Sequence, residues 1–523
     1  MSDKVYGIDL GTTYSAIAKI DEFGMPKEIK NMDGDDATPS VVYFEGDNNV
    51  IVGKEAKASL VAEPEHGVKL IKREIGNRYP LEFQGKEYTP ESISGIILRS
   101  LVEAANAKEG TDVNQVVITV PAYFGTQERE ATKQAGQMAG LEVVGIVTEP
   151  VAAALSVAQN SDKPETFLVY DLGGGTFDTT VMKVDQHRTD GPKVEVLAID
   201  GNRLLGGADW DDRLANVVAG KIQNQLGIDE NPLDDPEFRV ELLQMVEDKK
   251  KSLTDRENVK IGPLYYDGQR VTVELSRDEF NEATADLVAQ TIEIAKRTVA
   301  TAEQNAPGLS IDRVLMVGGS SRMRMIPKAL QDAGWDPQPT DYDLAVAKGA
   351  ALFGQNAIEE EATWEHEQRQ ELGDEVFEQK LEDVGGDVSE LKRQLPGAVG
   401  GSSGSMVANV LSRALGIAFV DGIEFFFHTN DKLPAGPEIV GATTVENNQI
   451  SAEVTLYEQA GEIESSEIAD NKLLATVEMP IPAGKPAGYD IDLVLSVSDE
   501  GLCVVVVSDP QTGEERRLEA AVS

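Results

Sequence analysis

One cysteine, Cys503, occurs in the 523 residues, and aromatic residues make up only 6% of the chain. A single cysteine excludes an intrachain disulfide and any metal site built from several cysteines of one chain. No stretch approaches the roughly eighteen consecutive apolar residues that a membrane-spanning helix needs. The apolar segment that follows the first four residues is also too short for the core of an export signal. The sequence therefore predicts a cytoplasmic protein with no membrane partner.

Positive charge is scarce as well. The chain has 47 lysine and arginine residues against 91 aspartate and glutamate residues, which gives a formal net charge of −44. Such a field repels phosphate backbones and anionic membranes at long range, so we expect no nucleic acid partner, although a local basic cluster can still hold a nucleotide. A role of the acidic surface in solubility or in adaptation to salt is favoured over a recognition surface.

The sequence also lacks the loop G-x-x-x-x-G-K-[ST], which excludes the P-loop fold as the phosphate binder. It contains instead two similar segments, Val5–Thr13 (VYGIDLGTT) and Leu168–Thr176 (LVYDLGGGT). In each, an apolar strand ends in aspartate and leads through glycine to threonine. Glycines let backbone N–H groups approach phosphate oxygens, and two aspartates can hold a hydrated Mg²⁺. Two copies predict duplicated lobes that clamp a nucleotide from both sides.

Both segments lie in residues 1–358, where short β-branched runs alternate with helical patterns, as in α/β domains. Apolar residues at spacings of three and four predict one long helix from Arg277 to Ala302. A third glycine loop, Val314–Arg322, also leaves a predicted strand. We interpret it as the floor of an adenosine pocket.

Residues 359–406 differ in character from the rest of the chain. Between Glu359 and Arg393 there are thirteen acidic and four basic residues, and a heptad rhythm of apolar residues predicts an acidic amphipathic helix broken at Gly385 and Gly386. A solvated connector that packs one stripe on the preceding domain is favoured over a partner-binding coiled coil. The Gly/Ser-rich stretch that follows predicts a flexible linker.

After the linker the pattern changes to β structure. Apolar residues alternate with polar ones from Asp490 to Val507, with a turn at Asp499–Gly501, which predicts a hairpin with one buried face. Residues 407–523 therefore predict a small β-sandwich domain.

Seven motifs in the first 355 residues resemble those of the seventy-kilodalton heat-shock chaperones of the DnaK type. They are GIDLGTTYS (7–15), IKREIG (71–76), VITVPAYF (117–124), EPVAAA (149–154), VYDLGGGTFD (169–178), LLGGADWD (204–211) and VGGSSR (317–322). The resemblance implies an actin-like ATPase domain with two lobes, each a copy of an RNase H-like fold, followed by an all-β sandwich that binds substrate. It also implies ATP and ADP as ligands, with Mg²⁺ and K⁺.

The resemblance also implies roles for particular residues. Asp9 and Asp171 are expected to order the Mg²⁺ shell. Lys72 is expected to stabilise charge on the transferred phosphoryl group, while Glu149 and Asp178 position or deprotonate the attacking water. These are tasks that phosphoryl transfer requires. The implied phosphate contacts are Gly11, Thr12, Thr13, Tyr14, Gly173, Gly174, Gly175, Thr176, Gly206 and Gly207.

The implied adenosine pocket has two sides. Its residues are Glu247, Lys250, Lys251 and Thr254 on one side, and Gly318, Gly319, Ser320, Arg322 and Asp343 on the other. Lys251 stands where the family usually has arginine, so a planar group that could stack on adenine is lost. Thr254 replaces a serine. We expect weaker affinity for adenine nucleotides with the phosphate machinery intact.

The C-terminal part resembles the family less closely. Val420 and Val445 fall where the family arches over bound peptide, so they are candidate substrate contacts, with plain core residues as an equal alternative. The segment 359–405 replaces the family's short linker. This puts in doubt the usual coupling of ATP binding to peptide binding, the docking of a J-domain cochaperone, and a nucleotide exchange factor as a partner. The chain ends soon after the sandwich, so we expect no helical lid and fast release of bound peptide.

The sequence thus predicts an ATP-hydrolysing molecular chaperone that binds unfolded polypeptide. Three alternatives are a sugar or metabolite kinase of the same fold, an actin-like filament protein, and a nucleotide-gated module for one dedicated partner. Lys72 and Glu149 suit attack by water rather than by a sugar hydroxyl. The β-sandwich and the strong negative charge argue against a filament.

Overall fold

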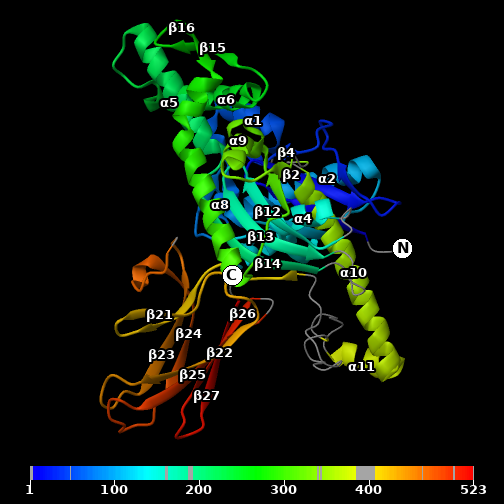
Figure 1. Ribbon diagram of the computed structural model, residues 1–523, viewed down its shortest axis with the longest axis vertical. Coiled ribbons are helices and arrows are strands. Elements are labelled where there is room, and N and C mark those ends of the chain that lie inside the picture. The colour runs from blue at the N-terminus through cyan, green and yellow to red at the C-terminus, as the bar shows by residue number, and fades with distance from the viewer. Residues whose placement is uncertain are drawn as a thin grey trace.

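A computed structural model describes most of the chain. The described residues are 4–46, 49–158, 163–185, 193–338, 341, 344–383, 391, 407–461, 463–498 and 501–521. Within them, two lobes built on separate sheets form the upper part of Figure 1, and a C-terminal β region (residues 407–521) lies below them. None of the helices in these ranges is long and apolar enough to cross a membrane.

Each lobe contains one mixed sheet, and the two sheets share a pairing pattern. The first has the strand order β11-β10-β1-β2-β3, and the second has the order β18-β17-β12-β13-β14-β19. Strand β1 is antiparallel to β2 and parallel to β10, just as β12 is antiparallel to β13 and parallel to β17. The duplication predicted from the two aspartate segments is therefore confirmed by the topology.

The bounds of these strands place the predicted motifs at strand ends. The strands are β1 Val5–Asp9, β2 Tyr14–Ile20, β3 Pro26–Ile29, β10 Gln115–Val120, β11 Glu142–Thr148, β12 Glu165–Leu172, β13 Phe177–Asp185, β14 Lys193–Asn202, β17 Arg313–Val317, β18 Pro337–Gln338 and β19 Val407–Ala408. Smaller sheets of the lobes are formed by β5 Val41–Glu45 with β6 Asn49–Val52 and β7 Gly67–Lys69, by β8 Leu81–Phe83 with β9 Lys86–Tyr88, and by β15 Asn258–Tyr266 with β16 Gln269–Ser276, while β4 Thr38–Pro39 joins β2.

Helices cover the sheets, and two of them cross at close range. The helices are α1 Lys54–Ala62, α2 Pro90–Glu109, α3 Thr126–Met138, α4 Glu149–Ala158, α5 Gly207–Leu226, α6 Pro236–Leu253, α9 Met325–Asp332 and α10 Ala345–Leu372, with the 3₁₀ turns η2 Ile71–Glu74 and η4 Gly319–Arg322. Helix α10 packs on α4 and on the strands β1, β2 and β10. A Cβ on Gly349 of α10 would overlap the carbonyl oxygen of Ala152 in α4, so glycine is what permits this approach.

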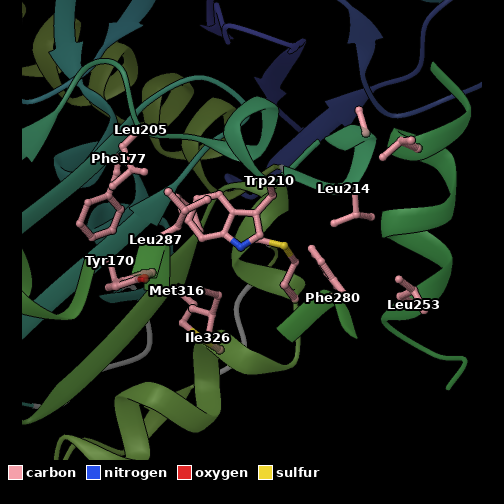
Figure 2. Packing of buried hydrophobic residues seen from close by; sticks show 14 of the residues in the cluster. Tyr170, Phe177, Leu205, Trp210, Leu214, Leu253, Phe280, Leu287, Met316 and Ile326 are labelled. Carbon is pink, nitrogen blue, oxygen red and sulfur yellow. The ribbon is translucent and has the colours of Figure 1, made fainter. Parts of the chain in front are cut away.

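The core of the second lobe forms around Trp210, which is fully buried. Figure 2 shows its indole ring among side chains from several elements, including Leu214 of the same helix, Phe280 and Leu287. Because Gly206 is the N-cap of α5 and Gly207 its first residue, burial of this indole anchors the helix whose first turn borders the predicted phosphate loop.

The long helix predicted from Arg277 to Ala302 is divided in two. Helix α7 spans Arg277–Ala283 and α8 spans Ala285–Asn305. Thr284 between them leaves the helical conformation (φ −122°, ψ 11°), and its buried hydroxyl donates a hydrogen bond of 2.9 Å to the carbonyl of Phe280. A threonine hydroxyl that bonds the preceding turn competes with regular helix geometry, which accounts for the break.

The acidic helical segment begins earlier in the chain than its sequence pattern suggests. Helix α10 starts in the core of the lobes and continues past residue 358 to Leu372, and α11 (Asp374–Asp383) follows Gly373, whose φ is 83°. Phe377 of α11 is fully buried against Trp364 of α10, with a ring-centroid distance of 6.2 Å. The expected break at Gly385 and Gly386 and the Gly/Ser-rich stretch lie outside the described residues.

The C-terminal β region consists of two antiparallel sheets. Their orders are β21-β20-β23-β24 and β22-β25-β26-β27. The strands are β20 Leu415–Phe419, β21 Gly422–Phe427, β22 Ala435–Thr443, β23 Ser451–Gln459, β24 Asn471–Pro480, β25 Asp490–Val497, β26 Leu502–Ser508 and β27 Glu515–Ala521. One core joins the two sheets, so the predicted sandwich and the predicted hairpin of β25 with β26 are confirmed.

The β region is joined to the second lobe by backbone hydrogen bonding. Strand β19 pairs in parallel with β14, through Val407 opposite Val194 and Ala408 opposite Glu195. Asn430 supports the junction, because its side chain accepts a hydrogen bond from the Ile199 amide (2.7 Å) and donates one to the Ile199 carbonyl (3.2 Å). The first strand of the β region thus completes the sheet of the second lobe.

Cys503 gives a direct measure of β-region unfolding. It is fully buried in β26, and burial raises the pKa of its thiol to about 12. We expect the native protein at pH 8 to be alkylated by iodoacetamide at least about 100-fold more slowly than the urea-unfolded chain, because little thiolate forms and access is blocked. Mass spectrometry of timed samples measures this, and equal rates in the two states would contradict the burial of β26.

Candidate functional site

The two predicted phosphate loops face each other. A Cβ on Gly174 would overlap the side chain of Thr13, and one on Gly175 would overlap that of Thr12. The first loop is fixed from its own lobe. The Ser40 amide and hydroxyl donate to the carbonyls of Thr13 (2.9 Å) and Gly11 (2.7 Å) respectively. Glycine-rich turns with threonine hydroxyls therefore meet at one place from the two lobes, and such turns are suited to phosphate recognition.

The first turn of α5 closes the second loop. The amide of Gly207 donates to the carbonyl of Gly173 (2.9 Å), and the amide of Ala208 donates to that of Gly174 (2.8 Å). Gly206 lies so close to Gly175 that a Cβ would overlap the backbone. These contacts bring Gly206 and Gly207 to the loop of Gly173–Gly175.

Lys72 and Glu149 form a buried ion pair beside the loops. Lys72 lies in η2 and Glu149 is the first residue of α4, and their side chains are 5% and 10% exposed. The lysine ammonium donates to Glu149 Oε1. Such a pair places a fixed positive charge and a proton acceptor together in a site of low dielectric constant, where both act strongly.

Two aspartates bring further negative charge into the same space. Burial raises the pKa of Asp171 well above its ordinary value, the charges of Glu149 and Asp9 raise it further, and Lys72 lowers it. Burial also raises the pKa of Asp178, and the charges of Glu149 and Asp171 add to the effect. Asp9 is held at the end of β1, where it accepts a hydrogen bond of 3.1 Å from Thr119 Oγ1.

These residues fit a bound Mg²⁺. Both carboxylate oxygens of Asp178 are buried without a hydrogen-bond partner among the described residues, so the site leaves polar atoms that a hydrated cation would satisfy. Within the described part of the chain, no three His, Cys, Asp or Glu side chains are grouped so as to enclose a metal. Mg²⁺ keeps several waters and needs only one or two carboxylates together with phosphate oxygens.

The predicted adenosine pocket is only partly assembled from described residues. Lys250 donates hydrogen bonds to the Gly207 carbonyl (2.7 Å) and to Asp211 (2.8 Å). A Cβ on Gly207 would overlap Ser320 Oγ, so α5, α6 and the loop of Gly318–Arg322 meet at one place. Thr254 follows the end of α6, and its carbonyl accepts a hydrogen bond of 2.5 Å from Arg324 Nε. Asp343 lies outside the described residues.

Lys251 does not lie free to face a base. Its ammonium is 2.8 Å from both Glu247 Oε1 and the hydroxyl of Tyr14, and it lies over the Tyr14 ring. Lys57 of α1 adds a second contact to Glu247, at 2.5 Å. Tyr14 and Lys57 belong to the first lobe, whereas Glu247 and Lys251 belong to the second. We name these four residues the cleft clamp.

Charge holds the cleft clamp together over a wide pH range. Burial alone would raise the pKa of Glu247, but the charges of Lys251 and Lys57 outweigh it and lower that pKa to about 2. Because this pKa is below the ordinary value of 4.5, Glu247 stabilises the closed cleft above about pH 4.5. This stabilisation is lost progressively as pH falls from there towards 2.

Glu247→Gln is expected to accelerate release of ADP about tenfold, which corresponds to ~1.4 kcal/mol, because Lys57 loses its ion-pair partner in the other lobe and Lys251 loses its partner within α6. Stopped-flow dissociation of a fluorescent ADP analogue measures the rate. Glu274→Gln is the control, since its ion pair with Lys260 (3.1 Å) is exposed at the far tip of the same lobe. Equal rates for Glu247→Gln and the parent chain would refute the clamp.

Sequence reasoning missed Arg73, which also joins the lobes. Its Nε and Nη2 donate to the carbonyl of Gly175 at 2.9 and 2.6 Å, and Nη2 lies 3.4 Å from Asp209 Oδ2. Asp209 in turn caps α5 by accepting from the Gly206 amide (2.7 Å). The only signal in the sequence was that Arg73 follows Lys72 in the IKREIG motif. A single arginine does not show that its partner is Gly175, 102 residues later.

Val420 and Val445 both lie at the surface of the β region. They are 79% and 60% exposed, so the alternative that they are core residues is wrong. Val420 lies in the turn between β20 and β21, and Val445 follows β22. Their exposure leaves them accessible to a ligand.

The two-lobed fold with facing phosphate loops defines an actin-like nucleotide-binding protein. A family model described as Hsp70 protein matches residues 5–82 and 79–363, which is more than half of the chain. The chain therefore belongs to the Hsp70 family, whose members are ATPases that bind ATP with Mg²⁺ and K⁺ and act as chaperones on polypeptide clients.

Proposed function

We propose that this protein hydrolyses ATP to ADP and phosphate, and that the bound nucleotide controls how its β region binds unfolded or extended polypeptide. The observation that carries the proposal is the buried Lys72–Glu149 pair, whose charges act on Asp171 and Asp178 beside two facing glycine loops. This combination suits attack by water on a phosphoryl group. We also assign the unit boundaries 1–358, 359–406 and 407–523 to the ATPase domain, the connector and the substrate domain.

The residues act on the phosphates by position and charge. Thr12, Thr13 and Thr176 orient the β- and γ-phosphates together with the loop amides. Bound Mg²⁺ would neutralise charge on the phosphate oxygens, with Asp9 and Asp171 ordering its waters. Lys72 stabilises the charge that develops on the transferred group. Glu149 and Asp178 accept hydrogen bonds from the attacking water and orient it in line with the leaving ADP.

Polypeptide binding is assigned to the exposed valines of the β region. Val420 and Val445 would contact apolar side chains of an extended segment, and an extended segment can add backbone hydrogen bonds of its own when it binds. We include a J-domain cochaperone and a nucleotide exchange factor among the proposed partners, because the family match extends over the whole ATPase domain.

Two measurements on the purified chain test the proposal. Phosphate release with Mg²⁺ and ATP tests hydrolysis, and fluorescence anisotropy of a labelled apolar peptide tests binding with ATP and with ADP. We expect slow turnover and tighter peptide binding with ADP. Absence of turnover would refute the ATPase assignment. Turnover without peptide binding in either state would favour a module for one dedicated partner.

A further inference from the structure

The aspartates that end the apolar runs of β1 and β12 occupy equivalent positions in the two lobes, but their neighbours on the parallel strand differ. The register of β1 with β10 brings Thr119 to the level of Asp9, directly after their last strand pair. The register of β12 with β17 places Val317 opposite Asp171. A hydroxyl therefore stands in the first lobe where the second lobe has an apolar side chain.

The neighbours on the antiparallel strand differ as well. Asp9 pairs with Ala16 of β2, whereas Asp171 pairs with Asp178 of β13. The second lobe thus places two carboxylates side by side, while the first lobe places one carboxylate between a hydroxyl and a methyl group. The two copies of the fold have kept the aspartate and changed what surrounds it, so the two aspartates are held in different ways.

The hydroxyl beside Asp9 is buried and bonded to it. Thr119 is 0% exposed, and its Oγ1 donates a hydrogen bond of 3.1 Å to Asp9 Oδ1. An ionised carboxylate only accepts hydrogen bonds, so the threonine is the donor. A buried hydroxyl needs a partner, but a backbone carbonyl would suffice, as for Thr132 of α3, which donates to the carbonyl of Glu128 (2.7 Å). Thr119 is paired with a carboxylate of the site instead.

The direction of the Asp9 carboxylate matters because of where it lies. Asp9 is the last residue of β1, and the first phosphate loop follows it. That loop faces the loop of the second lobe, where a Cβ on Gly174 would overlap the side chain of Thr13. Hydrogen bonds to a carboxylate that serves a metal fix its orientation, and their loss typically costs about 10–100-fold in metal affinity or activity.

We propose that Thr119 is a positioning residue for Mg²⁺ in this protein, because its hydroxyl orients the Asp9 carboxylate that orders the waters of the ion. Val317 at the equivalent position of the second lobe has no hydroxyl to take over this task. The inference rests on the proposed ATPase activity, in which Asp9 has that role. Its effect is nevertheless measurable by nucleotide binding alone.

Thr119→Val in the full chain tests the proposal, since it removes the hydroxyl and keeps the shape of the side chain. Binding of a fluorescent ADP analogue is measured across a Mg²⁺ titration and in EDTA. We expect the Mg²⁺ concentration for half-maximal tightening to rise about tenfold, with affinity in EDTA changed less than about twofold. The Mg²⁺ concentration for half-maximal ATP turnover should rise equally, while kcat at saturating Mg²⁺ falls less than about threefold. Thr119→Ser keeps the donor and should restore both Mg²⁺ requirements.

The matched control is Thr132→Val, which removes a buried threonine hydroxyl of the same lobe and should leave both Mg²⁺ requirements unchanged. An unchanged requirement in Thr119→Val would overturn the positioning role. Equal loss of ADP affinity with and without Mg²⁺, or a Thr119→Ser variant as impaired as Thr119→Val, would overturn it too. A parent chain that binds ADP but does not turn over ATP would overturn the proposed function, while the Mg²⁺ titration of ADP binding would still decide the role of Thr119.

Discussion

Lys72→Met is expected to reduce single-turnover ATP hydrolysis by about 10²–10³-fold, the usual loss when one preorganised charge at a transition state is removed. ATP binding should persist, because the phosphate loops and the clamp are untouched. The ammonium is buried against Glu149, and methionine of similar length leaves no donor there. Rapid mixing of protein with labelled ATP, followed by quenching, measures the rate of the chemical step.

The control for this variant is Lys69→Met, three residues earlier, where the lysine is exposed on β7. It should hydrolyse ATP at the parent rate. A Lys72→Met variant with normal hydrolysis but a lowered melting temperature would show that the ion pair serves only the fold.

Asp171→Asn should have two effects of opposite sign. Hydrolysis should fall about 10²–10³-fold and lose its dependence on Mg²⁺, because one of the two carboxylates that order the ion is gone. The nucleotide-free protein should melt at a higher temperature at pH 7. The folded-state pKa of Asp171 is raised by burial and by nearby acids, so its ionisation weakens folding at pH values above the unfolded pKa.

Turnover measured across a Mg²⁺ titration, together with thermal melts without nucleotide, tests both effects. Asp33→Asn replaces an exposed aspartate of the first lobe and should change neither quantity. Unchanged Mg²⁺-dependent turnover in Asp171→Asn would refute the site. Lower thermal stability would show that Asp171 is stabilised by contacts other than those described.

The parts of the site that follow strands were predictable from the sequence. Asp9 and Asp171 end apolar runs. The glycines that follow them have few roles other than to let the backbone come close to another group. Lys72 and Glu149 were a different case, because they are 77 residues apart and neither spacing nor composition pairs them. Only the family resemblance brought them to the site. The contacts of Lys57 and Arg73 were not predicted, because the partner of each residue lies in the other lobe.

Two helical segments have other bounds than the sequence pattern predicted, and in each case the cause is local. Thr284 continues the apolar spacing of its helix, so periodicity gives no sign that its hydroxyl bonds the preceding turn and ends α7. The acidic segment was recognised as helical, but α10 begins in the hydrophobic core, where the composition differs from that of its outer part. In a sequence, a change in composition within one helix such as α10 cannot be distinguished from a boundary between two domains.

The pairing of β19 with β14 has a consequence during synthesis of the chain. About 205 residues separate these two strands, so β14 leaves the ribosome long before its edge partner exists. An uncovered strand edge is a template for unwanted association with other chains. The nascent second lobe is thus exposed to aggregation until the start of the β region emerges, and release of a chain truncated before residue 407 would make that exposure permanent.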